Sequence, residues 1–67
     1  MADHTGRTYA EVFPDAAGEF RSHVFDANGH ELFKSSEGYV DRAHAADMIR
    51  SRFGPIPIEH LDAAPPD

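Results

Sequence analysis

The side chains of this chain that most readily do chemistry are five histidines and an excess of carboxylates, twelve Asp and Glu against six Lys and Arg. A zinc site needs three or four converging ligands, often two histidines four residues apart on a helix. None of the histidines has such a partner; they are His4, His23, His30, His44 and His60. His44 and Asp47, three residues apart on an expected helix, could supply only two ligands of such a site. We therefore expect no metal site, and interpret the histidines as solvent-facing groups that titrate near neutrality.

Catalysis without a metal would need paired carboxylates in a dry cleft, or a nucleophile activated by a neighbouring base. The carboxylates that could act as acids or bases fall in turns or on solvated faces: Glu19, Glu31, Glu37 and Asp41. Ser35 and Ser36 have no His–Asp arrangement beside them that the sequence reveals. A domain this small rarely encloses a substrate pocket. The sequence therefore predicts a protein that is not an enzyme and holds no cofactor, with a composite site between two copies as the enzymatic alternative.

The length of the chain limits how such side chains can be positioned. Its 67 residues allow one domain, and a domain of that size buries only about 60% of its unfolded surface. Small domains usually add disulfides, a metal or a partner subunit, and this chain has no cysteine. The expected partner is therefore a second copy of the chain, in a homodimer.

Charge and hydropathy restrict the other partners. A formal net charge of -6 repels nucleic-acid backbones, so the alternative of a small nucleic-acid-associated regulatory protein depends on a local basic patch formed by Lys34, Arg42, Arg50 and Arg52. No run approaches the roughly 18 apolar residues that span a bilayer, and the polar N-terminus lacks the apolar core of a signal peptide. We expect no membrane partner and a cytoplasmic location. The acidic, lysine-poor composition fits either salt adaptation or a GC-rich genome.

The expected domain spans residues 8–61 and follows a flexible leader at 1–7. Residues 8–13 are rich in β-formers and give the first strand, which the turn residues of 14–18 end. Residues 19–25 alternate between two faces, which predicts a half-buried second strand.

A hairpin is predicted at Asn28 and Gly29, because a two-residue type I′ turn needs positive φ at both central positions. Apolar residues flank this dipeptide: Val24 and Phe25 before it, Leu32 and Phe33 after it. The third strand should therefore pair antiparallel with the second.

One helix is predicted over residues 42–53. Asp41 can cap its start, and Gly54 followed by Pro55 can end it. An apolar stripe at helical spacing would pack on the sheet; it comprises Ala45, Met48, Ile49 and Phe53.

A short last strand is predicted at Ile56 and Ile58, followed by a disordered tail at 62–67. Pro55 and Pro57 lack N–H donors on the same side of this strand. The strand should therefore lie at an edge of the sheet or at a bulged join.

Several short motifs occur in a fixed order: Gly18-Glu19-Phe20-Arg21, Asn28-Gly29, Ser36-Glu37-Gly38-Tyr39, and a helix carrying Ile49. Together they resemble the YegP-like family of small bacterial and archaeal domains, over about residues 9–52. The resemblance implies a three-stranded sheet, a helix and a final strand, with two units that join into one sheet and exchange their C-terminal strands. It implies no activity. Where this family often has a large aromatic residue the chain has Ser22, so the core there must be filled differently.

The expected fold is α+β: a β-β-β-α-β unit with an antiparallel sheet and one packed helix, in a homodimer that shares one sheet with exchanged C-terminal strands. The residues expected in the core or dimer interface are Phe20, Val24, Phe25, Leu32, Phe33, Ile49, Phe53, Ile56 and Ile58. The residues expected to shape turns and motifs are Gly18, Arg21, Asn28, Gly29, Ser36, Glu37, Gly38 and Tyr39.

The function predicted from these features is a small non-catalytic homodimeric domain, a protein-interaction or structural module with an unidentified protein partner. The turn at 36–39 is interpreted as structural, with Gly38 supplying an unusual backbone angle and Tyr39 packing under the helix; a contact loop is the alternative. Arg21, Arg42 and Arg50 could form an anion-binding patch, but the many carboxylates nearby favour ion pairs instead.

Overall fold

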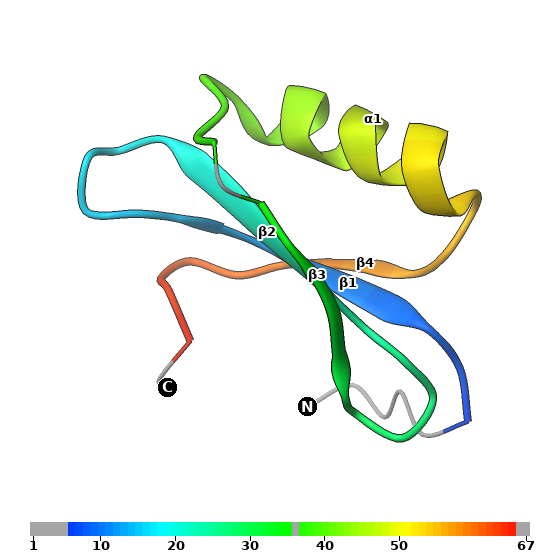
Figure 1. Ribbon diagram of the computed structural model, residues 1–67. Coiled ribbons are helices and arrows are strands. Elements are labelled where there is room, and N and C mark those ends of the chain that lie inside the picture. The colour runs from blue at the N-terminus through cyan, green and yellow to red at the C-terminus, as the bar shows by residue number, and fades with distance from the viewer. Residues whose placement is uncertain (1–5, 36, 66–67) are drawn as a thin grey trace.

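A computed structural model of the chain describes residues 6–35 and 37–65. One helix lies across one face of a four-stranded sheet (Figure 1). The elements follow in the order β1 (Tyr9–Pro14), β2 (Phe20–Phe25), β3 (Glu31–Lys34), α1 (Arg42–Phe53) and β4 (Ile58–His60). The predicted α+β class and the β-β-β-α-β order are confirmed. Most of the expected leader, Ser36 of the turn motif and the end of the expected tail lie outside the described residues.

The sheet is mixed, which corrects the expectation of an antiparallel sheet. Its strand order is β3-β2-β1-β4, with β2 antiparallel to both neighbours and β4 parallel to β1. The sheet is mixed because of the crossover through α1. The helix carries the chain from β3, at one edge of the sheet, to the far side of β1, where β4 runs in the same direction as β3. The pairing of Ala10 with Ile58 fixes the register of β4. In the single chain, β4 therefore completes the sheet beside its own β1.

The second hairpin is confirmed, but its predicted turn type is wrong. The Asp26 amide donates to the His30 carbonyl at 2.8 Å, and the Gly29 amide donates to the Asp26 carbonyl at 3.0 Å. Gly29 has a φ of 86°, whereas no described residue other than glycine has a positive φ, so Asn28 does not adopt the angle that a type I′ turn requires. The pattern is that of a three-residue loop with a type I turn followed by a glycine bulge.

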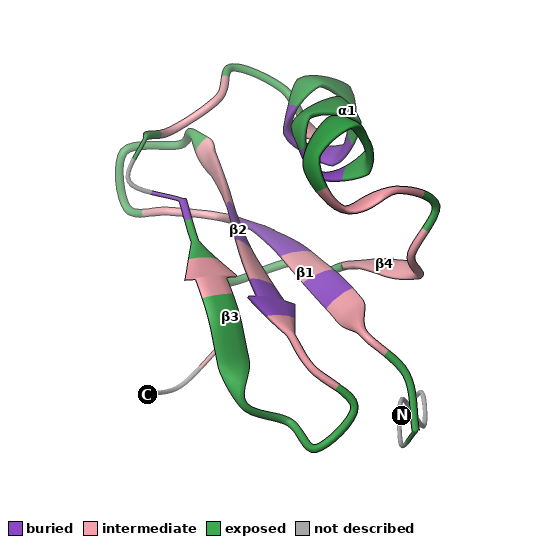
Figure 2. Cartoon of the chain, turned by 45° about the vertical axis from the view of Figure 1, so that its right-hand side comes forward, coloured by how far each residue is buried: buried purple, intermediate pink, exposed green. Residues whose placement is uncertain are grey.

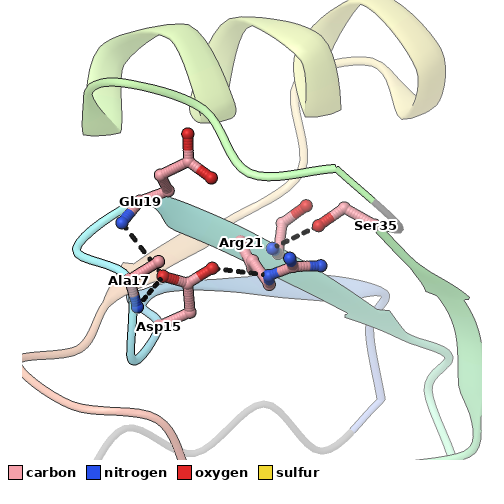
Figure 3. Close-up of polar contacts among 6 residues, drawn as sticks. Asp15, Ala17, Glu19, Arg21 and Ser35 are labelled. Atoms are coloured by element: carbon pink, nitrogen blue, oxygen red, sulfur yellow. Dashed lines mark hydrogen bonds and ion pairs between the residues drawn. The ribbon is translucent and has the colours of Figure 1, made fainter.

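The first hairpin closes with the same loop. The Asp15 amide donates to the Glu19 carbonyl at 2.7 Å, and the Gly18 amide donates to the Asp15 carbonyl at 3.1 Å. Asp15 Oδ1 also accepts from the amides of Ala17 and Glu19, at 2.9 and 3.0 Å (Figure 3). Asp26 Oδ1 accepts in the same way from the amides two and four residues later, both at 2.9 Å. An aspartate at the first position and a glycine three residues later thus shape both loops.

The helix begins and ends where the sequence predicts. Asp41 Oδ1 accepts from the His44 amide at 2.8 Å, which satisfies a donor of the first turn. Gly54 has a φ of 81° and donates its amide to the Arg50 carbonyl at 2.9 Å. These caps are local in sequence, which is why both ends could be predicted.

The buried stripe of the helix differs from the predicted one. Ala45, Ala46 and Ile49 are buried, whereas Met48 is 45% exposed. The helix makes most of its contacts with β2 and β1, and meets β3 through Arg52 and Phe53, which lie against Phe33. Ala46 consequently faces the sheet, and Met48 lies outside the buried core.

The core lies between α1 and the inner face of β1 and β2 (Figure 2). The buried apolar residues are Ala10, Val12, Phe13, Val24, Ala45, Ala46 and Ile49. The side chain of Phe13 lies on the opposite face of β1. There it lines a cavity of about 140 Å³ together with Ala64 and Pro65. Ala10, Val12, Phe13 and Ala46 are the members of this set that the sequence reasoning missed. No helix among the described residues is long and apolar enough to cross a membrane.

The residues expected in the core or interface occupy three kinds of position. Val24 and Ile49 are buried, and four others pack, partly buried, against their cluster: Phe33, Phe53, Ile56 and Ile58. Phe20 and Phe25 are half-buried. Leu32 is 54% exposed, because the register of β2 and β3 shifts there and leaves it without a partner strand residue.

Candidate functional site

A cavity of about 330 Å³ opens between α1 and β3, beside the strands β1 and β2 that the helix mainly covers. Its lining residues come from the sheet, from the turn before the helix and from the second half of the helix: Ser22, Phe33, Tyr39, Met48, Ile49, Ser51 and Arg52. These side chains offer apolar surface, hydroxyl groups and one guanidinium, which can bind and orient a molecule. The described lining includes no carboxylate, imidazole or thiol that could act as a general base.

Ser22 forms the floor of this cavity, since it is only 2% exposed. Its backbone is fixed by Ser35: the Ser22 amide donates to Ser35 Oγ at 3.0 Å (Figure 3), and the Ser35 amide donates to the Ser22 carbonyl at 3.0 Å. Within the described parts of the chain, no hydrogen bond to the Ser22 hydroxyl is found. The hydroxyl is also not among the buried polar atoms that lack a partner, since none of these is found in the described parts. The hydroxyl therefore reaches the cavity, which occupies part of the space beside this small residue.

Phe33 and Arg52 form the outer wall. The Arg52 guanidinium lies 4.9 Å from the centre of the Phe33 ring, and that ring packs 5.7 Å from the ring of Phe53. Arg50, two residues earlier on the helix, pairs with Asp47 at 3.5 Å. No carboxylate of the described residues forms an ion pair with Arg52. The opening of the cavity therefore carries a positive charge that no carboxylate of residues 6–35 and 37–65 contacts.

The predicted turn motif borders the same cavity. The Phe20 amide donates to the Tyr39 carbonyl at 2.7 Å, and the Tyr39 amide donates to the Phe20 carbonyl at 2.9 Å. The centre of the Tyr39 ring lies 4.9 Å from the centre of the His44 ring. Gly38 does not have a positive φ, so the prediction of an unusual backbone angle there is wrong. A Cβ at Gly38 would instead lie 2.6 Å from Cβ of Glu19. Glycine is required at this position by the close approach of two chain segments.

The arginines considered for an anion-binding patch have separate partners within the chain. Arg21 Nε donates to Asp15 Oδ2 at 2.7 Å, and Arg50 pairs with Asp47 as described above. Arg42 donates to the carbonyl of Leu61 at 2.8 Å and lies 4.7 Å from the centre of the Phe20 ring.

The basic patch on which a nucleic-acid interface would depend is also divided. Lys34 lies on the face of the sheet away from the helix, with His23 beside it in the β2–β3 register. Arg52 lies on the helix side. The two cations therefore do not share a surface.

The described histidines are dispersed over the fold, and His4 lies outside the described residues. His23 packs among aromatic rings on the open face of the sheet, with centroid distances of 4.8 Å to Phe13 and 6.0 Å to Phe25. His30 lies in the second hairpin loop, close to Asp26 at 3.7 Å. No group of three or more potential metal ligands is found among residues 6–35 and 37–65.

Among the described residues, perturbed pKa values are found for Asp15, Asp26 and Tyr9, none of which lines the cavity. The pKa of Asp15 is lowered, first by the hydrogen bond from Arg21 and then by the amides of its loop. The pKa of Asp26 is lowered chiefly by the hydrogen bond from the His30 amide. The pKa of Tyr9 is raised by burial and by nearby carboxylates. Both aspartates act in loop structure, so their pKa values do not indicate a catalytic pair.

Comparison with known proteins assigns the family. The chain is 34% identical over 56 residues to a UPF0339 protein of Neisseria meningitidis serogroup B, an alignment that covers 79% of this chain and 98% of the relative. This chain belongs to the UPF0339 family. A UPF0339 protein of Neisseria meningitidis serogroup A matches with the same identity and coverage. No family model matches the chain, and no solved structure matches it significantly.

The UPF0339 assignment agrees in part with the resemblance noted in the sequence. Both indicate a small domain without an assigned activity, and the relatives do not carry the YegP-like name. Because the alignment covers 98% of the Neisseria relative, the shared unit is the whole of that protein.

Proposed function

We propose that this UPF0339 chain is a non-catalytic homodimeric module, in which two copies share one sheet and exchange β4, and which contacts a further protein. The proposal rests on how β4 pairs with β1. The Ala10 amide donates to the Pro57 carbonyl at 2.9 Å, and the Leu61 amide donates to the Val12 carbonyl at 2.8 Å. Backbone groups alternate along a strand, so those of Ile58 and His60 point away from β1, toward the outer edge of the sheet.

This outer edge retains its hydrogen-bond donors. The N and C=O of one strand residue point to the same side, so the missing donor of Pro57 faces β1 together with its carbonyl. The proline therefore does not block the outer edge, where Ile58 and His60 present both donors and acceptors. An open edge of this kind pairs readily with another strand, and a symmetric homodimer is the commonest way to cover it.

Exchange of β4 would preserve every contact that this strand makes. Ile56 and Ile58 pack against the cluster of Ala10, Val24 and Ile49, and a second copy supplies an identical segment. The connector from Gly54 to Pro57 is the element that would have to extend. Because this chain has few large buried residues, burying the connector between two copies would increase the stability of the fold.

Analytical ultracentrifugation at micromolar concentration tests the dimer. We expect a sedimentation coefficient and mass of two chains, unchanged by added salt because the contact is backbone and apolar. A well-folded species with the mass of one chain would contradict the homodimer.

Engineered cysteines test the exchange separately, since the chain has no cysteine of its own. Glu11 and Glu59 are register partners on β1 and β4, so a Glu11→Cys/Glu59→Cys variant can form a disulfide across that pair. Exchange predicts a covalent dimer on a non-reducing gel. The matched control is Glu11→Cys/His23→Cys, whose partners lie in one hairpin and should crosslink within one chain. If both variants crosslink within one chain, the result contradicts exchange of β4. Whether two copies associate is then decided by the sedimentation experiment alone.

A further inference from the structure

We propose that the cavity between α1 and β3 binds a small aromatic carboxylate, with its ring against Phe33 and Tyr39, its carboxylate on Arg52, and a hydrogen-bonding group at the other end on Ser22. This inference goes beyond the homodimeric module. β4 and β3 are the two opposite edges of the sheet, so pairing at β4 leaves this cavity open.

The size and lining of the cavity favour a compact aromatic ring. Its volume of about 330 Å³ is at the lower end of small-molecule sites, which span roughly 300–1,000 Å³. Phe33 and Tyr39 present aromatic surface, and Met48 offers a thioether that packs well against a ring. Ile49, which is 1% exposed, closes the interior behind them.

Arg52 determines the charge of the ligand. Its guanidinium is held over Phe33, and no carboxylate of the described residues pairs with it. This is notable in a chain with twelve acidic residues and six basic ones, since Arg21 and Arg50 both contact an aspartate. A guanidinium binds a carboxylate through two parallel hydrogen bonds, so an anionic group at the opening complements it.

Ser22 determines what the other end of the ligand carries. Its residue lines the cavity and is only 2% exposed, and the hydrogen bonds found for it among the described residues involve its backbone amide and carbonyl. A polar group beside apolar surface favours a ligand that satisfies it and disfavours one that does not. A hydroxyl group remote from the carboxylate meets this requirement.

Titration of the full chain with hydroxynaphthoate, naphthoate and the neutral naphthamide tests the site, with methyl resonances of Met48 and Ile49 as the readout. For ligands of this size we expect saturable shifts with a Kd on the order of 1 mM or tighter. Hydroxynaphthoate should bind more tightly than naphthoate, and naphthamide about tenfold more weakly than naphthoate. Octanoate, an aliphatic carboxylate, should bind more weakly than naphthoate.

Two variants assign the effects to the two polar contacts. Arg52→Gln, an exposed position, should weaken both naphthoate compounds about tenfold and leave naphthamide unchanged. Arg50→Gln is the matched control and should leave all three unchanged, because Arg50 pairs with Asp47 outside the cavity. Ser22→Ala should reduce the affinity of hydroxynaphthoate to that of naphthoate, without changing naphthoate itself.

Several results would overturn the proposal. These are the absence of saturable shifts, shifts that map away from Met48 and Ile49, equal binding of naphthoate and naphthamide, or octanoate binding as tightly as naphthoate. A monomeric protein that binds naphthoate would leave this proposal intact and contradict only the homodimer.

Discussion

Arg21 Nε donates a hydrogen bond of 2.7 Å to Oδ2 of Asp15, across the start of the first hairpin. The other oxygen of the same carboxylate accepts from two amides of the loop (Figure 3). One aspartate thus joins the loop to β2. The hydrogen bond from Arg21 is the main reason that the pKa of Asp15 is lowered, and the loop amides lower it further.

The lowered pKa of Asp15 predicts a contribution to acid sensitivity. The unfolded chain titrates this group near the ordinary aspartate pKa of 3.8, and the native chain below it, so the native state binds fewer protons in that range. The stabilisation is complete above the unfolded pKa and is lost as the pH falls through the native pKa. Asp15→Asn should therefore make the free energy of unfolding, measured in urea at a series of acidic pH values, less steeply dependent on pH. Arg21→Gln, which removes the main cause of the lowered pKa, should reduce the slope in the same direction.

The loop type predicts unequal effects of substitutions at Asn28 and Gly29. Gly29 has a φ of 86° with open space around its Cα, so Gly29→Ala should cost about 1 kcal/mol through backbone strain alone. Asn28 has a negative φ, and Asn28→Ala should change stability by less than about 0.5 kcal/mol. A type I′ turn would instead make both substitutions costly. Urea unfolding of the two variants distinguishes the two loops.

Local signals made part of this fold predictable. Asp41 and Gly54-Pro55 mark the helix ends by chemistry that acts within one turn, and the structure places the ends there. Asn28-Gly29 is compatible with two loop types, and the choice depends on Asp26, whose side chain binds the loop amides. The sequence pattern alone gave that aspartate no role.

Non-local relationships account for what the sequence could not predict. The direction of β4 depends on where the helix returns the chain, and the burial of Ala46 in place of Met48 depends on which strands the helix covers. The cavity beside Ser22 follows from the same placement. Its signal in the sequence was a small polar residue on the inner face of a strand, which becomes informative only once the helix is known to lie mainly over β1 and β2.

Gly38 predicts a steric effect that depends on one neighbour. Because a Cβ there would lie 2.6 Å from Cβ of Glu19, Gly38→Ala should cost about 1–3 kcal/mol through overpacking. The clash involves the Cβ of Glu19, so Glu19→Ala should not relieve it, whereas Glu19→Gly should. A double-mutant cycle of Gly38→Ala with Glu19→Gly, measured by urea unfolding, should show a favourable coupling energy. Additive effects would contradict the contact.

Ser35 and Ser22 are both buried, yet their hydroxyls predict opposite consequences for stability. Ser35 Oγ accepts the hydrogen bond of the Ser22 amide at 3.0 Å, so Ser35→Ala leaves a buried N–H without its partner and should cost about 1–3 kcal/mol. Ser22→Ala removes a hydroxyl that has no partner among the described residues and keeps the amide bond to Ser35. It should change the free energy of unfolding by less than about 0.5 kcal/mol. Hydrogen exchange of the Ser22 amide gives an independent measurement: its protection should fall in Ser35→Ala and persist in Ser22→Ala. Equal losses of stability in the two variants would show that burial, and not this hydrogen bond, is what the two serines contribute.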